Sequence, residues 1–196
     1  MEGGVIRVRP AALAATDLTA LLHRWRDGDT DAREQVMGVV YDRVRAIAAQ
    51  SLQRQTGSTL TPTELAHEAL MRLFGADADW VDRQHFFHVV AQATRQVRVD
   101  RARRRLSDKR GAGAVALPLS QAEDIGFADR DEDLVRVDDA LSELATNDAR
   151  QARIVEMTYF GGFAREEIAK ALALSIGTVD RDLRFARAWL KDALTA

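Results

Sequence analysis

The chain has 196 residues, of which 46% are hydrophobic and 30% are charged, and its formal net charge at pH 7 is −2. This composition is typical of a folded globular protein of one or two domains rather than a disordered one. The absence of cysteine excludes disulfides, thiolate zinc sites and cysteine nucleophiles. No apolar run approaches the roughly 18 residues of a membrane span and there is no secretory signal, so we expect a cytoplasmic protein.

Only three prolines and an abundance of alanine, leucine, arginine and glutamate predict an all-α fold. Residues 1–15 are expected to be a loosely ordered tail. Thr16 and Asp17 can cap a first helix that ends near Gly28. A second helix is predicted from about Asp31. Its apolar residues recur at helical spacing and are expected to face inward: Val36, Val40, Val44 and Ile47.

A strong helix start signal follows Leu60. Thr61 is a capping residue, Pro62 takes the first helical position, and Glu64 stands three residues after the cap. This pattern indicates a capping box. The helix is expected to end at Gly75. Its apolar face is predicted to consist of Leu65, Ala69, Leu70, Leu73 and Phe74.

A long helix is predicted from about Gln84 to the glycines at 111 and 113. Its first half has an apolar stripe beginning at Phe86, with Phe87 expected off that stripe. Its second half is basic, since residues 95–110 hold eight arginines and lysines against two aspartates, a local net charge of +6. A solvated helix end is the alternative, but this charge exceeds what solubility requires and favours a nucleic-acid face.

Small and then acidic residues separate this helix from the rest of the chain. Residues 123–148 hold ten acids against two arginines, a local net charge of −8, which suggests a solvating or clamp-like segment. We expect a flexible linker over residues 111–132. It would join an N-terminal domain at 16–110 to a C-terminal domain at 133–196.

The most informative motif is the pair of helices at the end of the chain. A first helix with an apolar stripe is followed by a break at residues 173–175, and Ser175 can cap the second helix. The apolar stripe of that second helix comprises Ile176, Val179, Leu183, Ala186 and Leu190. Basic residues lie off the stripe, which is the arrangement that reads a DNA major groove. The alternative is a helical hairpin with a solvated charged face.

These motifs resemble a known family. The C-terminal pair is similar to region 4 of sigma-70-type factors, above all the extracytoplasmic-function (ECF) group. The residues that carry this likeness are Tyr159-Phe160-Gly161-Gly162, Glu166-Glu167-Ile168-Ala169, Leu172, Ser175, Gly177-Thr178-Val179 and Arg187-Ala188. The N-terminal half resembles region 2 through Glu64-Leu65, Leu70, Arg72, Leu73, Phe86-Phe87 and residues 99–105. The resemblance covers roughly residues 16–110 and 133–194.

The resemblance implies a promoter-recognition subunit rather than an enzyme, built as two small helical domains joined by a flexible linker. No catalytic residue, cofactor or metal is expected. The implied partners are core RNA polymerase, through its β′ clamp and β flap, and promoter DNA, with no membrane. It leaves the existence of an anti-sigma factor open.

The resemblance also assigns roles to residues. Region 4 would contact the −35 element through Ser175, Thr178, Arg181, Arg184 and Arg187. Asp180 and Asp182 are expected to accept from neighbouring arginines or from cytosine. Region 2 would hold the opened −10 element, with aromatic surfaces for an unstacked base and cations for the single strand, through Trp80, Phe87, Arg95, Arg98, Arg101 and Arg105. The polymerase-binding set would be Thr63, Glu64, Leu65 and Arg72.

The sequence departs from the family pattern at two places. Ala173 stands where the turn between the two helices usually has glycine, and a left-handed alanine there costs on the order of 1 kcal/mol. Acidic residues usually precede the leucine of the clamp-binding helix, and only Glu64 is present here. We therefore hypothesise that a Ser/Thr kinase phosphorylates Thr63 or Thr61, which would supply about −1.5 to −2 charges. A capping box alone explains Thr61 but not Thr63.

Two other functions remain open from the residues alone. A helix-turn-helix transcriptional regulator with an N-terminal sensing domain would bind duplex DNA without polymerase. An α-helical metal-dependent enzyme would need a ligand cluster, for which His85, His88 and Asp82 offer a crude candidate without a second supporting group.

Overall fold

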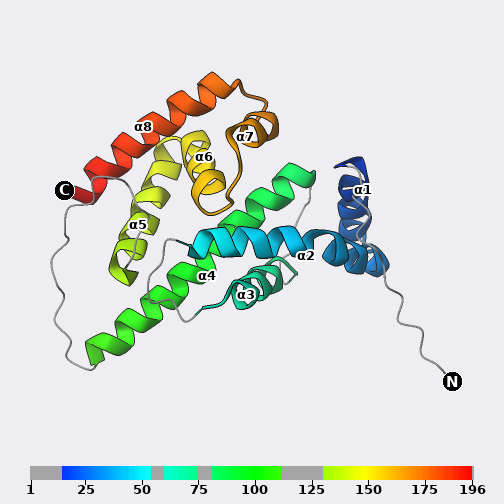
Figure 1. The fold of residues 1–196 in the computed structure, drawn as a ribbon, viewed down its shortest axis with the longest axis horizontal. Coiled ribbons are helices and arrows are strands. Elements are labelled where there is room, and N and C mark those ends of the chain that lie inside the picture. Colours follow the sequence, from blue (N-terminus) through cyan, green and yellow to red (C-terminus); the bar gives the residue numbers. More distant parts are fainter. Residues whose placement is uncertain (1–14, 54–59, 75–80, 112–129, 196) are drawn as a thin grey trace.

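A computed structural model describes residues 15–53, 60–74, 81–111 and 130–195 (Figure 1). Within these ranges the regular elements are helices, which confirms the all-α prediction. They are α1 (Ala15–Arg26), α2 (Thr30–Leu52), α3 (Pro62–Phe74), α4 (Arg83–Gly111), α5 (Asp131–Asn147), α6 (Ala149–Tyr159), α7 (Arg165–Ala171) and α8 (Ile176–Thr195).

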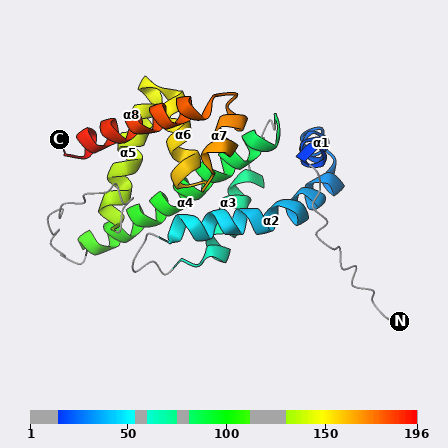
Figure 2. The ribbon, with the colours of Figure 1, turned by 45° about the horizontal axis from the view of Figure 1, so that its top comes forward.

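The long helix α4 runs through the middle of the molecule. Helices α2 and α3 pack on one side of it, and α5 and α6 pack on the other (Figures 1 and 2). Helix α8 packs against α5 and α6 on the side that faces away from α4. Segments at opposite ends of the chain therefore meet on a single helix. Most of the predicted linker, residues 112–129, lies outside the described residues, and α5 begins at Asp131, inside the range predicted for the linker.

The capping box predicted for α3 is confirmed, whereas the cap predicted for the first helix is wrong: α1 already begins at Ala15, so Thr16 and Asp17 lie inside it. Asp29 caps α2 by accepting from the Ala32 amide at 3.0 Å, and Gly28, which ends α1, has φ of 96°. The capping box of α3 is complete: Thr61 Oγ1 accepts from the Glu64 amide at 3.2 Å, and Glu64 Oε2 accepts from the Thr61 amide at 2.8 Å. These bonds satisfy amide groups that no intrahelical carbonyl can reach.

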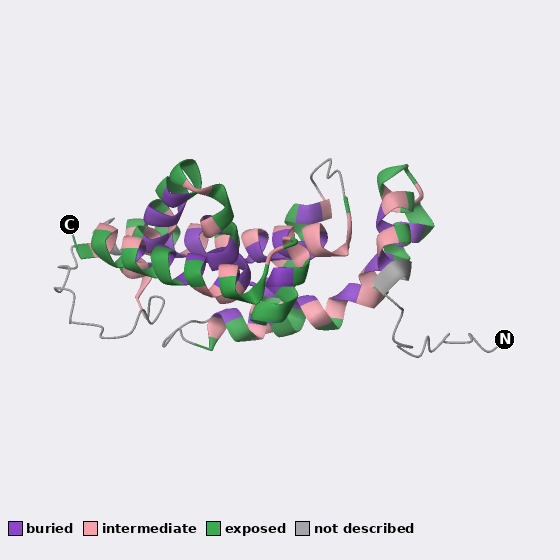
Figure 3. Ribbon diagram, turned by 90° about the horizontal axis from the view of Figure 1, so that it is seen from above, coloured by how far each residue is buried: buried purple, intermediate pink, exposed green. Residues whose placement is uncertain are grey.

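Buried residues recur along the helices (Figure 3), and their side chains form two clusters, one on each side of α4. The N-terminal core is built from α1, α2, α3 and the α4 residues Phe86, Phe87, Val90, Ala93 and Val97. The C-terminal core is built from α5 to α8 and the α4 residues Ala91, Val99 and Ala102. Helix α4 thus buries two faces, whereas its sequence predicted one apolar stripe.

The last two helices are joined by the predicted break. Ser175 caps α8, since its Oγ accepts from the Thr178 amide at 3.1 Å. Ala173 has φ of 52°, so the residue that replaces glycine is left-handed, as the departure from the family pattern suggested. Ile168 of α7 packs with Val179 and Leu183 of α8, which fixes the second helix against the first.

Candidate nucleic-acid interface

One candidate interface is the outer face of α8. Arg181, Arg184 and Arg187 are exposed there, while Val179, Leu183, Ala186 and Leu190 of the predicted apolar stripe are buried. Ile176, predicted to belong to that stripe, is exposed instead, because it stands at the first position of α8, where the helix has only begun to pack against α7. Ser175 is exposed and Thr178 half-buried at the helix start, where amide groups and the helix dipole favour an anion. The structure therefore brings all five residues predicted for the −35 element onto one helix and its cap.

The three arginines differ in the contacts that their guanidinium groups make with other side chains. Arg187 is held, since its Nε donates to Tyr159 Oη at 2.5 Å and its guanidinium lies 5.5 Å from the centre of that ring. Arg181 Nε lies 3.7 Å from Asp182 Oδ1. Within the described part of the chain, the guanidinium of Arg184 has no hydrogen-bond or ion-pair partner. Arg184 is therefore the arginine of this face that can contact a ligand without breaking an existing pair.

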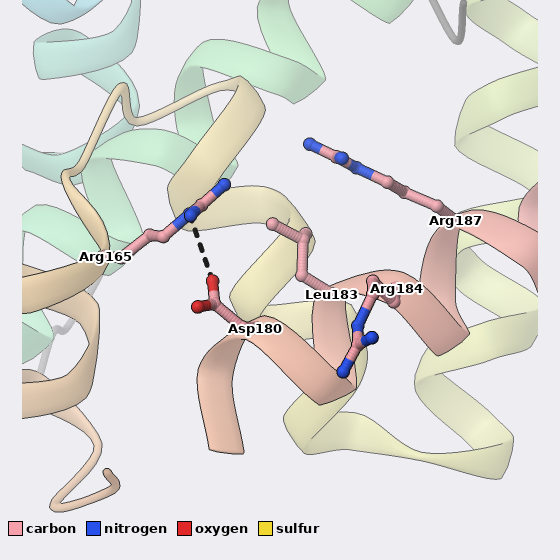
Figure 4. A pocket seen from close by; sticks show the side chains of 5 residues that line it. All are labelled: Arg165, Asp180, Leu183, Arg184 and Arg187. Carbon is pink, nitrogen blue, oxygen red and sulfur yellow. Dashed lines mark ion pairs between the residues drawn. The ribbon is translucent and has the colours of Figure 1, made fainter. Parts of the chain in front are cut away.

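A shallow pocket of about 390 Å3 lies between α7 and α8, and arginines line it (Figure 4). Arg165 of α7 pairs with Asp180 at 3.1 Å across it. In Figure 4 the Arg184 guanidinium points away from that of Arg187. Asp182 is buried and accepts from Arg150 Nε at 2.8 Å. The expectation that arginines engage these two acids is confirmed, since Asp182 accepts a hydrogen bond and Asp180 forms an ion pair, and these pairs keep both carboxylates from facing DNA unpaired.

The residues predicted for the −10 element lie in more varied surroundings. Arg101 is half-buried and donates to Glu68, and this hydrogen bond raises the pKa of Arg101. Arg105 makes two bonds to Asp131, of 2.8 and 2.7 Å. The Arg95 side chain extends from α4 toward α5 and α6, and its Nη2 lies 3.1 Å from Glu156 Oε1. Trp80, the other aromatic candidate, lies outside the described residues.

Two of the predicted −10 residues are buried. The expectation that Phe87 lies off the core stripe is wrong: it is 5% exposed and packs edge-on against Phe86, with ring centres 5.3 Å apart. Arg98 is 4% exposed, its Nη1 donates to Ser51 Oγ at 2.9 Å, and burial lowers its pKa to about 10. In this conformation neither side chain is accessible to DNA, and their promoter role stays a prediction.

The residues predicted to bind polymerase are spread over both faces of α3. Leu65 is fully buried and therefore supports the helix from inside. Arg72 pairs with Asp100 of α4 at 2.6 Å. Thr63 is half-buried, and its Oγ1 lies 3.4 Å from Nε of Arg45. Sequence reasoning missed Arg45, since it belongs to α2 and nothing in its own segment marks it.

The histidines and Asp82 do not converge on one point. Asp82 Oδ1 accepts from the backbone amide of His85 at 2.7 Å, at the start of α4. His88 Nε2 instead lies 3.0 Å from Glu156 Oε2, in a buried pair. Among the described residues there is no group of three or more His, Cys, Asp or Glu placed to hold a metal ion. In the same part of the chain, no helix has the length and apolar character that a membrane crossing needs.

One family model matches the chain. The family model described as "ECF sigma factor" matches residues 15–196, which is nearly the whole chain. Among solved structures, the chain is similar to the sigma factor RpoE in its co-crystal structure with the anti-sigma factor NepR from Bartonella quintana. The two chains are 19% identical, with a TM-score of 0.38, and the match covers 83% of this chain and 96% of that one. No curated protein matches the chain.

Proposed function

Since this chain belongs to the ECF sigma factor family, which acts in transcription initiation, we propose that it binds core RNA polymerase through the α3 surface and contacts promoter DNA through α4 and α8. Helix α8 would lie in the major groove of the −35 element, with α7 crossing the backbone. Helix α4 would hold the opened −10 element. In this proposal the chain performs no chemistry of its own.

The observation that carries this proposal is the state of Arg184. It is exposed on the second helix of a capped helix-turn-helix, and no described residue neutralises it. The neighbouring acids of the same helix are both paired with arginines from other helices. Around Arg184 the outer face of α8 thus presents cations, while the two nearby carboxylates are held in ion pairs, which suits the phosphates and base edges of a groove.

Association with polymerase separates this proposal from the helix-turn-helix regulator. Affinity-tagged chain should capture purified core RNA polymerase, and the pair should then select promoter fragments. A regulator would instead bind duplex DNA tightly on its own and leave polymerase behind. Capture of DNA by the free chain, together with no association with core polymerase, would reject the proposal.

We further propose that phosphorylation of Thr63 strengthens polymerase binding. Thr61 is already committed to the cap, since its hydroxyl donates to Glu64 Oε2 at 2.8 Å and accepts from the Glu64 amide. Thr63 is not part of that box, and among the described residues its hydroxyl lies 3.4 Å from Nε of Arg45. A phosphate there would be favoured by the N-terminus of α3 and would have a guanidinium within reach. It would restore negative charge where relatives carry acids.

Paired variants test the phosphorylation proposal. Thr63→Glu should bind core polymerase more tightly than unmodified protein, and Thr63→Ala should lack promoter activity in cells. Thr61→Ser retains a hydroxyl cap and serves as the matched control. Intact protein from active cells should carry the phosphate on Thr63 by mass spectrometry. Full polymerase binding and promoter activity of Thr63→Ala in cells would contradict the proposal.

A further inference from the structure

Carboxylates from the C-terminal helices cover the basic face of α4. We call them the carboxylate row, which consists of Asp131, Asp138 and Asp139 of α5 and Glu156 of α6. Arg105 forms a two-bond pair with Asp131. Arg103 Nη2 lies 3.0 Å from Asp138 and 2.9 Å from Asp139. Arg95 lies 3.1 Å from Glu156 and 3.4 Å from Asp138. Three arginines along α4 are thus each matched to acids from the other half of the chain.

The inner end of this contact is buried. Glu156 is 5% exposed, and its Oε2 lies 3.0 Å from His88 Nε2 and 3.1 Å from Gln92 Nε2, both on α4. Burying a carboxylate is costly unless several donors satisfy it. The side chains of α4 supply these donors across a separation of more than 60 residues along the chain. The buried carboxylate of Glu156 is therefore satisfied only while α6 is packed against α4.

The docked contact leaves polar groups incompletely satisfied. The Arg95 side chain is 12% exposed, and its Nε has no acceptor among the described residues. Burial raises the pKa of Asp138, although Arg95 and Arg103 oppose this effect. On the apolar side, α4 contributes mainly small residues to the C-terminal core, two alanines and Val99. Small side chains bury little area, so charge pairing is a large share of what holds α5 and α6 against α4.

We propose that the carboxylate row takes the place of nucleic-acid phosphates on α4, so that the free chain is closed and α4 can bind promoter DNA only after α5 and α6 have moved away from it. This inference rests on the proposed function, because the carboxylate row would block the promoter role proposed for α4. One guanidinium fork cannot form two bonds to a carboxylate and to a phosphate at once. Only open chains can then bind DNA through α4. The apparent dissociation constant for DNA is therefore the intrinsic constant divided by the fraction of chains that are open.

Distance measurements on the free full-length chain test the closed state. Because the chain has no cysteine, Glu34→Cys in α2 and Ala145→Cys in α5, both exposed, can carry spin labels for pulsed electron resonance. We expect one narrow distance distribution. Asp138→Lys with Asp139→Lys should broaden it and move it to longer distances, because lysines then face Arg95 and Arg103.

The matched control for this experiment is Glu143→Lys. Glu143 is exposed on α5, one turn after Asp139, and no described residue pairs with it. It should leave the distribution unchanged. Far-UV circular dichroism should show that all variants remain helical. A broad, long distribution in the free parent chain would overturn the proposal, as would an unchanged distribution in the charge-reversed pair.

A binding measurement separates masking from mere docking. With a fluorescein-labelled oligothymidylate of about 16 nucleotides as the probe, Asp138→Asn with Asp139→Asn should bind roughly tenfold more tightly than the parent chain. Glu143→Gln should bind like the parent. Equal affinity of all three chains would overturn the masking proposal while leaving polymerase capture, and hence the proposed function, intact. Loss of polymerase capture with the tenfold gain preserved would reject the proposed function alone.

Discussion

Arg98 shows how a residue that looks like a nucleic-acid contact in sequence can belong to the interior. It lies in the basic run, yet its guanidinium is buried beside Ser51 and 5.7 Å from the ring centre of Phe160. Burial lowers its pKa to about 10, so it stays charged at neutral pH. The same side chain touches elements from both halves of the molecule, which favours a structural role in this conformation.

Replacement of Arg98 should therefore change stability. We expect Arg98→Ala to lower the free energy of unfolding by about 2–4 kcal/mol, since it removes a large buried side chain and leaves the Ser51 hydroxyl without that donor. Arg104→Ala, at an exposed arginine six residues later, should change it by less than about 0.5 kcal/mol. Urea unfolding followed by circular dichroism measures both. Similar stabilities of the two variants would contradict the buried placement.

Ala173 gives a prediction of opposite sign. Its φ of 52° is a conformation that glycine adopts without a Cβ penalty. Ala173→Gly should raise the free energy of unfolding by roughly 0.5–1 kcal/mol. Ala188→Gly, the same substitution in the interior of α8, should lower it by about 1 kcal/mol. Thermal unfolding measures both variants. A fall in the melting temperature of Ala173→Gly as well as of Ala188→Gly would contradict the left-handed conformation of Ala173.

At the scale of elements, the start of α3 is sensitive to acid. Hydrogen bonds from the backbone and hydroxyl of Thr61 hold the pKa of Glu64 below its usual value of 4.5. A lowered carboxyl pKa means that the stabilisation is fully present above pH 4.5 and is lost as the pH falls through the folded-state pKa. Acidification should therefore loosen the first turn of α3.

Nuclear magnetic resonance can follow this effect. The amide signals of Thr61 and the first turn of α3 should shift together as Glu64 becomes protonated at a pH below 4.5. Glu64→Gln should abolish that titration step while the rest of the helix persists. A titration midpoint at or above 4.5 would show that the capping box is not formed in solution.

Local sequence signals predicted the elements well and their contacts less well. Caps and glycines are read within a few residues, so the starts of α3 and α8 could be predicted. Periodicity identifies one apolar stripe per helix, but α4 packs on two sides, so Phe87 joined the core against expectation. The pairing of His88 with Glu156 spans 68 residues. No local pattern encodes a partner at that separation.

At the scale of the whole molecule, the charge asymmetry of the sequence has a structural counterpart. The basic run of α4 and the acidic stretch that follows it were predicted to act separately, one on nucleic acid and one as a solvating or clamp-like segment. In the structure Arg103 and Arg105 of the first pair with Asp139 and Asp131 of the second. Partly exposed pairs are screened by salt. A rise in ionic strength should thus favour the open chain.

We propose that this ECF sigma factor directs polymerase to promoters through the outer face of α8. The most direct measurement is transcription by purified core polymerase on fragmented genomic DNA from the source organism, with the 5′ ends of the transcripts sequenced. Arg184→Ala is the test variant. Arg153→Ala, at an exposed arginine of α6 without a partner in the described residues, is its control.

We predict that the parent chain and Arg153→Ala start transcripts at the same positions, preceded by a shared −35 sequence. Arg184→Ala should start about tenfold fewer transcripts there while still capturing polymerase, because it loses a groove contact of roughly 1–3 kcal/mol. Undiminished, identically placed transcripts from Arg184→Ala would contradict the assigned face of α8, and transcripts without shared start sites would contradict the sigma function itself.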